Sequence, residues 1–175
     1  MDGRGAPQNV ARAQRRPESF YADQALAERA VGMASPLIES AMRDKRHGDS
    51  GFLHVVVMNP GLGPADSRFE DAILYEHSFG DRSKWDADYQ AFARAKTEVA
   101  WRHQRDSHAV QALQPHRLAN GETTLWGSVW VDGIVVGASG AFAPFDEAYS
   151  GVVAMCLRAL AKQRAEENAK ALFLR

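Results

Sequence analysis

The chain has 175 residues, of which 45% are hydrophobic and 25% are charged, and its formal net charge is −1. This near-neutral balance argues against a general nucleic-acid binder, whose domain is usually strongly basic, and the single cysteine, Cys156, excludes a disulfide framework and every multi-cysteine metal site. No apolar run approaches the roughly 18 residues of a membrane span, and residues 1–17 lack the apolar core of a signal peptide, so we expect a cytoplasmic globular protein without a membrane partner.

The N-terminal segment differs in composition from the rest of the chain. Residues 1–19 contain four arginines, two acidic residues and little that is apolar. Such a segment cannot bury enough surface to offset the entropy lost on ordering, so we expect a flexible basic arm. The alternative is an arm that contacts an acidic partner or a nucleic acid. Residues 20–175 are predicted to form a single domain.

The first predicted helix begins after Asp23, a candidate N-cap, and is followed by apolar residues at three- and four-residue steps. These residues are Leu26, Ala30, Met33, Leu37 and Ala41. Pro36 lies inside the pattern, and we expect it to kink the helix or to split it in two.

The middle of the chain alternates between strand and helix signals. Phe52–Met58 is apolar and rich in β-branched residues, which predicts a buried strand, and Ala72–Phe79 predicts a weaker second strand. A helix is expected from about Asp86 to Arg105, followed by a short helical segment over Ser107–Leu113.

The C-terminal third carries the clearest pattern. Thr123–Val131 and Ile134–Ala141 flank Asp132-Gly133, a pair typical of the type I′ turn of a β-hairpin. A last helix is expected to begin near Pro144. This order of elements favours an α+β domain in which helices pack on an antiparallel sheet.

Two tryptophans are expected on one face of the hairpin. Side chains alternate between the faces of a strand, so Trp126, Ser128 and Trp130 would share a face. Unless something covers that face, both indole rings would be exposed. The two tryptophans predict either a ligand-stacking pair or a contact between subunits. The contact between subunits is the favoured interpretation, since aromatic residues are enriched at interfaces.

The same region resembles a known family. Val131–Gly140, VDGIVVGASG, followed by Asp146-Glu147, is similar to the "DG-x-VVGAIGVSG" and "DE" pattern of the GlcG/HbpS-like family, often called haem-binding or haem-degrading. The helix AFARAKT, residues 91–97, is similar to the family's "IA-x-x-KA" helix, with Lys96 on its lysine. Residues 23–27 are similar to its first helix, and the resemblance spans roughly residues 20–170.

The resemblance implies a profilin-like α-β-α fold with an antiparallel sheet of about five strands. It also implies assembly into a homo-oligomer, a dimer or larger. The expected activity is binding of a small molecule, haem or another planar aromatic compound, in a pocket between the sheet and the helices. No particular reaction is implied.

Lys96 and His103 are the candidate catalytic bases. Both lie on one face of the predicted helix, at about 100° per residue, together with Tyr89, Phe92, Ala93 and Ala100. A lysine within an apolar stripe loses proton affinity and can act as a base, a Schiff-base former or an anion clamp. The alternative is a lysine whose stem covers apolar surface while its ammonium stays in water or on a carboxylate.

His77 and His103 are the candidate axial ligands of a haem. Haem iron takes a neutral imidazole inside an apolar wall, which Trp101, Trp126 and Trp130 could supply.

Other residues have structural explanations. His54 lies among the apolar residues of the first strand and is predicted to be a core histidine with hydrogen-bond partners. His103 and His108 are five residues apart, which misses the i, i+4 spacing of a helical metal pair, so no metal site is expected. Gly137 and Gly140 predict a close backbone approach, either of a helix or of a ligand, and structural packing is the favoured interpretation.

Three functions therefore stand beside one another. The first is a small-molecule-binding protein of the GlcG/HbpS type. The second is a small accessory or degradative enzyme that acts on an aromatic or hydroxy-acid metabolite, with Lys96 or His103 as its base. The third is an oligomeric interaction module without a ligand.

Overall fold

A computed structural model describes residues 19–170 and 172–174, so the predicted arm, apart from Ser19, lies outside the described residues. The helices and strands follow the predicted order. They are α1 (Gln24–Ala41), β1 (Leu53–Met58), β2 (Ile73–Phe79), α2 (Tyr89–His103), α3 (Ser107–Leu113), β3 (Ser128–Val131), β4 (Ile134–Ser139) and α4 (Ala143–Glu167).

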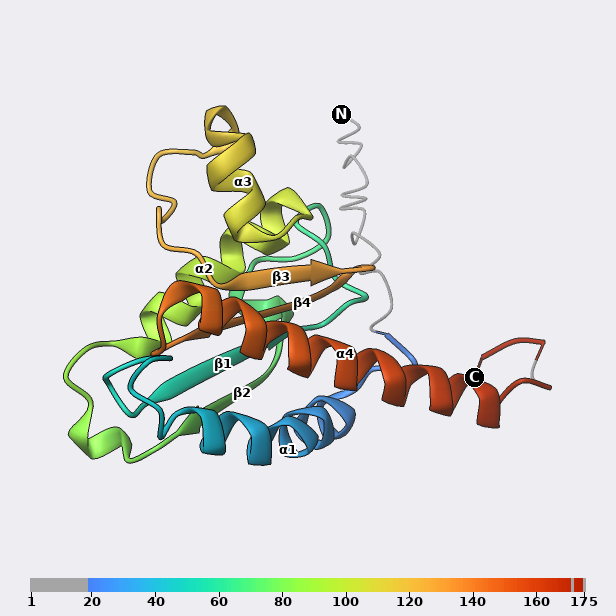
Figure 1. The fold of residues 1–175 in the computed structure, drawn as a ribbon. Coiled ribbons are helices and arrows are strands. Elements are labelled where there is room, and N and C mark those ends of the chain that lie inside the picture. Colours follow the sequence, from blue (N-terminus) through green and yellow to red (C-terminus); the bar gives the residue numbers. More distant parts are fainter. Residues whose placement is uncertain (1–18, 171, 175) are drawn as a thin grey trace, which may run out of the picture.

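The described strands form one antiparallel sheet in the order β2-β1-β4-β3. Helices α1 and α4 lie side by side on one face, α2 covers the other face, and α3 lies beyond β3 (Figure 1). The expected α+β class is confirmed. The predicted hairpin is present, and Asp132 and Gly133 have the positive φ angles, 51° and 90°, that a type I′ turn requires.

The expectation of about five strands is not confirmed, because the described part of the chain contributes four. The first hairpin strand begins at Ser128 instead of Thr123. Side chains of α3 bind the backbone that a longer strand would use: Gln111 Nε2 donates to the carbonyl of Leu125 at 2.7 Å, and Ser107 Oγ accepts from Gly127 N at 3.1 Å. These bonds hold the segment before β3 in an irregular path.

Two apolar cores lie on the two faces of the sheet. The larger core contains residues of α1 and α4 with Val55, Val57 and Val136 of the sheet, and the smaller one contains Val56 and Val135 with residues of α2. Because the central strands β1 and β4 contact a core on each face, every one of their residues is buried.

Helix α1 has its predicted start but is not split at Pro36, and its buried stripe differs from the prediction. It begins at the predicted cap, since Asp23 Oδ1 accepts from Leu26 N at 2.8 Å, but it continues through Pro36 without a break. Two predicted apolar positions, Met33 and Leu37, are 53% and 51% exposed, so the buried stripe is rotated relative to the prediction. Its members are Leu26, Ala27, Ala30, Val31, Ala34 and Ile38.

His54 is a core histidine, as predicted. It is buried, and its ring nitrogens lie 2.8 Å from Ser78 Oγ and 3.1 Å from Glu76 Oε1. Burial alone would raise the pKa of Glu76, but hydrogen bonds from Arg94 and His54 lower it to about 2. The imidazole therefore sits in a satisfied polar cluster between β1, β2 and α2.

The glycines of β4 are explained by close packing. A Cβ at Gly137 would overlap Thr97 Oγ1 of α2, and a Cβ at Gly140, whose φ is +142°, would overlap the carbonyl oxygen of Phe52. These contacts confirm the predicted backbone approach by protein. The contact between Gly137 and Thr97 also sets how closely α2 lies on the sheet.

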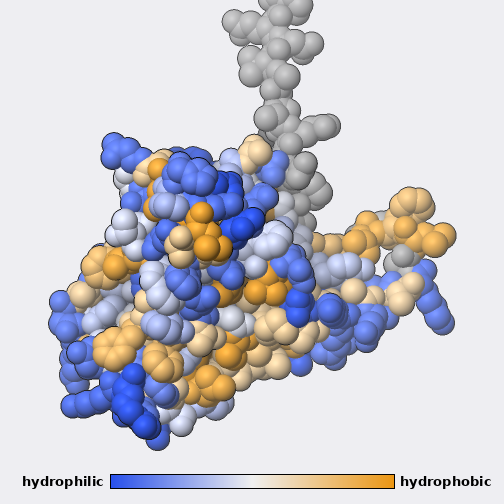
Figure 2. Space-filling view, turned by 45° about the horizontal axis from the view of Figure 1, so that its top comes forward, coloured by the Kyte–Doolittle hydropathy of each residue, from blue (hydrophilic) through white to orange (hydrophobic). Residues whose placement is uncertain are grey.

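The surface carries few apolar groups over α3 and more of them lower on the same face (Figure 2). Within residues 19–170 and 172–174, none of the helices combines the length and the apolar character needed to cross a bilayer.

Replacing Gly137 by alanine tests this packing. We expect Gly137→Ala to lower the free energy of unfolding by roughly 1–3 kcal/mol, because a methyl group is forced against Thr97 in a filled core. The matched control is Gly151→Ala in α4, where a Cβ meets nothing within 4 Å, and this change should stabilise the protein by roughly 0.5–1 kcal/mol. Urea unfolding measures both, and equal effects of the two changes would contradict the packing described.

Candidate functional site

Lys96 is buried and paired with Asp146. Its Nζ lies 2.7 Å from Asp146 Oδ2, 3.1 Å from Ser139 Oγ and 3.5 Å from the carbonyl of Ala138, so each of its three N–H groups has an acceptor. The side chains of Lys96 and Asp146 are only 6% and 1% exposed. The pair joins α2 to the first turn of α4 beside the end of β4. Of the two interpretations of Lys96, the structure shows the second, in which the ammonium group is paired with a carboxylate.

Opposing effects act on the Asp146 carboxyl. Burial is the largest and raises its pKa to about 6, against the attraction of Lys96 and the N–H groups of Ala141 and Gly140. Asp146 Oδ1 accepts from Ala141 N at 2.9 Å. Gly127 approaches so closely that a Cβ there would lie 2.6 Å from Asp146 Cβ, which leaves no room for a substrate on that side.

His103 has a different carboxylate partner. At the end of α2, its Nε2 lies 3.0 Å from Glu122 Oε2, and the two side chains are 11% and 8% exposed. Burial alone would raise the pKa of Glu122, but the N–H of Ala119 and the His103 imidazole hold it below its ordinary value. The pair ties the irregular segment before β3 to α2.

His77 lies on the other face of the sheet from His103. It pairs with Val55 in the register of β1 and β2, and Val55 belongs to the core of α1 and α4. The hydroxyl of Tyr75 lies 3.4 Å from His77 Nδ1. Burial, the largest effect, lowers the pKa of the His77 imidazole, and Glu28 and Glu39 oppose it.

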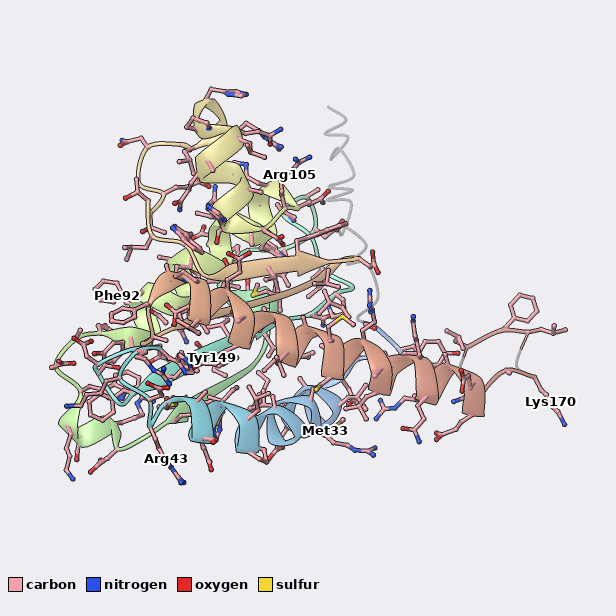
Figure 3. The ribbon with its side chains drawn as sticks, viewed as in Figure 1. Met33, Arg43, Phe92, Arg105, Tyr149 and Lys170 are labelled. Atoms are coloured by element: carbon pink, nitrogen blue, oxygen red, sulfur yellow. The ribbon has the colours of Figure 1, made fainter. Side chains whose placement is uncertain are left out.

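The predicted tryptophan wall is not assembled as one surface. Trp126 lies outside β3 and stacks on His108, with ring centroids 4.2 Å apart. Trp101 is buried, donates from Nε1 to the carbonyl of Leu62 at 3.0 Å, and shares a cavity with Trp130. Of the predicted site residues, the structure thus brings Trp101 and Trp130 together and leaves His77, His103, Lys96 and Trp126 elsewhere. Phe92, predicted on the face of Lys96, points into solvent (Figure 3).

The cavity that Trp101 and Trp130 share has a volume of about 540 Å³. Its walls are the loop at residues 59–66, the C-terminal end of α2 and the β3–β4 hairpin. This volume falls within the range of small-molecule sites. The cavity forms because α2 lies close to the sheet while the loop after β1 bends away over the end of α2.

Asn59 is the residue of this cavity that the sequence analysis missed. It is only 5% exposed, and its Oδ1 accepts from Gly61 N at 2.9 Å, which fixes the orientation of the amide. Its Nδ2 has no partner among the described residues. This nitrogen is still reached by solvent, since the fully buried side-chain atoms that lack a partner among the described residues are Trp85 Nε1 and Tyr149 OH. The sequence signal was an asparagine that directly follows a buried strand and precedes Pro-Gly, which predicted only a turn.

Arg102 brings a second donor to the cavity. Its Nε and Nη2 bind Glu98 at 2.8 and 2.7 Å, and Nη1 has no partner in the described part of the chain. Asp66 also lines the cavity, and its carboxylate accepts from Gly63 N at 3.3 Å. The wall therefore combines indole rings, two free donors and one carboxylate.

The cavity does not fit haem. Its described lining contains no histidine, cysteine, methionine or tyrosine, so it offers no axial ligand. His103 is held by Glu122, and His77 lies across the sheet. Within the described ranges, no group of three or more His, Cys, Asp or Glu residues could hold a metal ion.

Comparison with known proteins yields no relative: no family model, no curated protein and no solved structure matches the chain.

Removing one partner of the Lys96–Asp146 pair should be strongly destabilising. We expect Lys96→Met to lower the free energy of unfolding by about 3–5 kcal/mol, because it leaves a buried carboxyl unpaired, whereas adding Asp146→Leu should restore much of the loss. The control is Lys84→Met, which breaks an exposed pair with Asp81 and should cost less than about 1 kcal/mol. Chemical denaturation checks all three. A loss no larger than that of the control would show that the pair does not hold the fold.

The raised pKa of Asp146 predicts an unusual pH dependence. An unfolded aspartate titrates near 3.8, so between that pH and about 6 the native state binds more protons than the unfolded state. Relative to Asp146→Asn, the wild-type protein should gain on the order of 2 kcal/mol of stability as the pH falls from about 7.5 to about 4.5. Denaturation of both proteins across this range measures the difference. A relative loss on acidification would mean that Lys96 dominates the titration.

Proposed function

We propose that this protein binds a small planar compound that carries a carbonyl or carboxylate oxygen, in the cavity between the 59–66 loop, α2 and the hairpin. The observation that carries the proposal is Asn59 at the wall of the cavity, because its Oδ1 is fixed by Gly61 N and its Nδ2 is a donor without a protein partner among the described residues. An acceptor oxygen on the ligand would replace water on this preorganised donor.

The other walls support a planar ligand that carries an acceptor oxygen. Trp130 offers an indole ring beside the buried Trp101, and flat apolar rings stack favourably on such surfaces. Arg102 Nη1 adds a second donor for an oxygen.

Binding is favoured over catalysis by the positions of the two candidate bases. Lys96 and His103 each contact a carboxylate, and neither is among the described residues that line the cavity. The wider proposal keeps the features that the resemblance implies, a profilin-like protein of the GlcG/HbpS type that forms a homo-oligomer, together with the cytoplasmic location expected from composition. The similarity over residues 131–147 supports that part.

Titration with two matched aromatic probes tests the proposal. 2-Naphthoate and 2-naphthamide share a ring system and an acceptor oxygen and differ in charge. We expect at least one of them to quench tryptophan fluorescence with a dissociation constant below about 1 mM. Asn59→Asp keeps the acceptor for Gly61 N but replaces the free donor by an oxygen, and it should weaken binding about tenfold or more.

Two further variants separate the cavity from the rest of the surface. Trp130→Ala should weaken probe binding several-fold, because it removes a wall of the cavity. Trp126→Ala removes a tryptophan that stacks on His108 outside the cavity, and it should leave binding unchanged. Absence of binding by both probes, or an equal effect of the two tryptophan variants, would contradict the proposal.

A further inference from the structure

The two edge strands of the sheet, β3 and β2, differ in whether their outer backbone groups have hydrogen-bond partners. At the β3 edge, Trp130 N donates to Asp106 Oδ1 at 2.7 Å, and Ser107 Oγ bonds both the N–H and the carbonyl of Ser128, at 3.1 and 3.2 Å. These side chains at the start of α3 occupy backbone groups that point away from β4. The β3 edge is therefore closed to another strand.

The β2 edge is open. From Leu74 to Phe79, β2 bonds β1 on one side, and no backbone group on its other side has a partner among the described residues. Its sequence, ILYEHSF, contains neither proline nor lysine, the residues that commonly protect an edge. Six of its seven residues are half-buried, whereas every residue of the neighbouring β1 is buried.

We propose that β2 pairs in antiparallel fashion with β2 of a second copy of this chain, so that two four-stranded sheets become one continuous sheet. A twofold axis perpendicular to the sheet produces such an isologous contact and satisfies the open backbone groups of both copies at once. The pairing does not rest on the proposed ligand cavity, whose described lining contains no residue of β2.

The side chains of β2 favour a second copy in one register. Tyr75, His77 and Phe79 face the side of α1, while Glu76 and Ser78 face the side of α2. With Glu76 on the axis, two carboxylates would lie directly opposite each other, which is unfavourable. With His77 on the axis, Tyr75 lies opposite Phe79 and Glu76 lies opposite Ser78. This register avoids facing carboxylates and places each Glu76 beside a serine side chain instead.

Another surface competes for a second copy. Met33 on α1 and Val152 and Met155 on α4 line an open apolar hollow, and Met33 projects from this face in Figure 3. Nothing in that hollow is a buried polar group that lacks a partner, whereas the β2 edge holds a row of unbonded backbone groups. Because unbonded backbone groups need hydrogen-bond partners, the β2 edge is the stronger candidate of the two surfaces for contact with a second copy.

Light scattering on the full chain tests the pairing, because it measures the mass of the wild-type protein and of variants that carry a charge at His77 on the proposed axis. We expect the wild-type mass to approach twice 19.3 kDa as the protein concentration is raised to about 1 mM, and to fall towards 19.3 kDa on dilution. His77→Lys should weaken the dimer about tenfold or more, because two ammonium groups would face each other. Circular dichroism checks that this variant folds, because burial at position 77 disfavours a charge more than Glu28 and Glu39 of α1 favour it. The neutral control His77→Gln should keep the dimer, and Met155→Lys, on the competing face, should leave it intact.

Hydrogen exchange gives an independent readout. Alternate amides of β2 should be protected at high protein concentration and lose protection on dilution, whereas the amides of Ser128 and Trp130 should stay protected because α3 binds them. A monomer at every concentration would overturn the proposal. So would a dimer that Met155→Lys dissociates and His77→Lys does not, or a dimer in which every second β2 amide exchanges fast.

Discussion

The ion pair between Lys96 and Asp146 links three layers of the molecule at one point. Lys96 comes from α2 on one face of the sheet, and Asp146 comes from the start of α4, which packs on the opposite face. They meet past the end of β4, where Ser139 completes the shell. A buried charge pair is tolerated only where geometry and hydrogen bonds are nearly complete. This requirement constrains where both helices can lie.

The position of α2 in turn shapes the candidate site. Gly137 lets Thr97 touch the sheet, so the C-terminal end of α2 comes close to β4 and the loop after β1. Trp101 then binds the carbonyl of Leu62, and the cavity forms beside that bond. Asn59 is enclosed by the same loop, and its amide donor remains without a partner in the described structure. Packing that stabilises the fold thus also creates the polar feature on which recognition would depend.

Local sequence patterns predicted the helices and strands well, but they predicted less well which residues of each element are buried and what its backbone binds. The caps at Asp23 and the Asp132-Gly133 turn are local chemistry, and both are found as expected. The stripe of α1 was misplaced, because Met33 and Leu37 match helical spacing as well as the residues that are buried. The strand predicted from Thr123 is shorter because Gln111 and Ser107, which are near it only in the fold, bind its backbone.

Hydrophobic periodicity and turn chemistry act over a few residues, so they were sufficient to predict the α+β class, the order of the helices and strands, and the close packing at the glycines of β4. Only the tertiary structure decided the partners of the candidate site residues. It placed Lys96 on Asp146, 50 residues away, and His103 on Glu122, and it separated His77 from Trp101 by the thickness of the sheet. The partner of a charged side chain is set by contacts distant in sequence, and no local pattern encodes these.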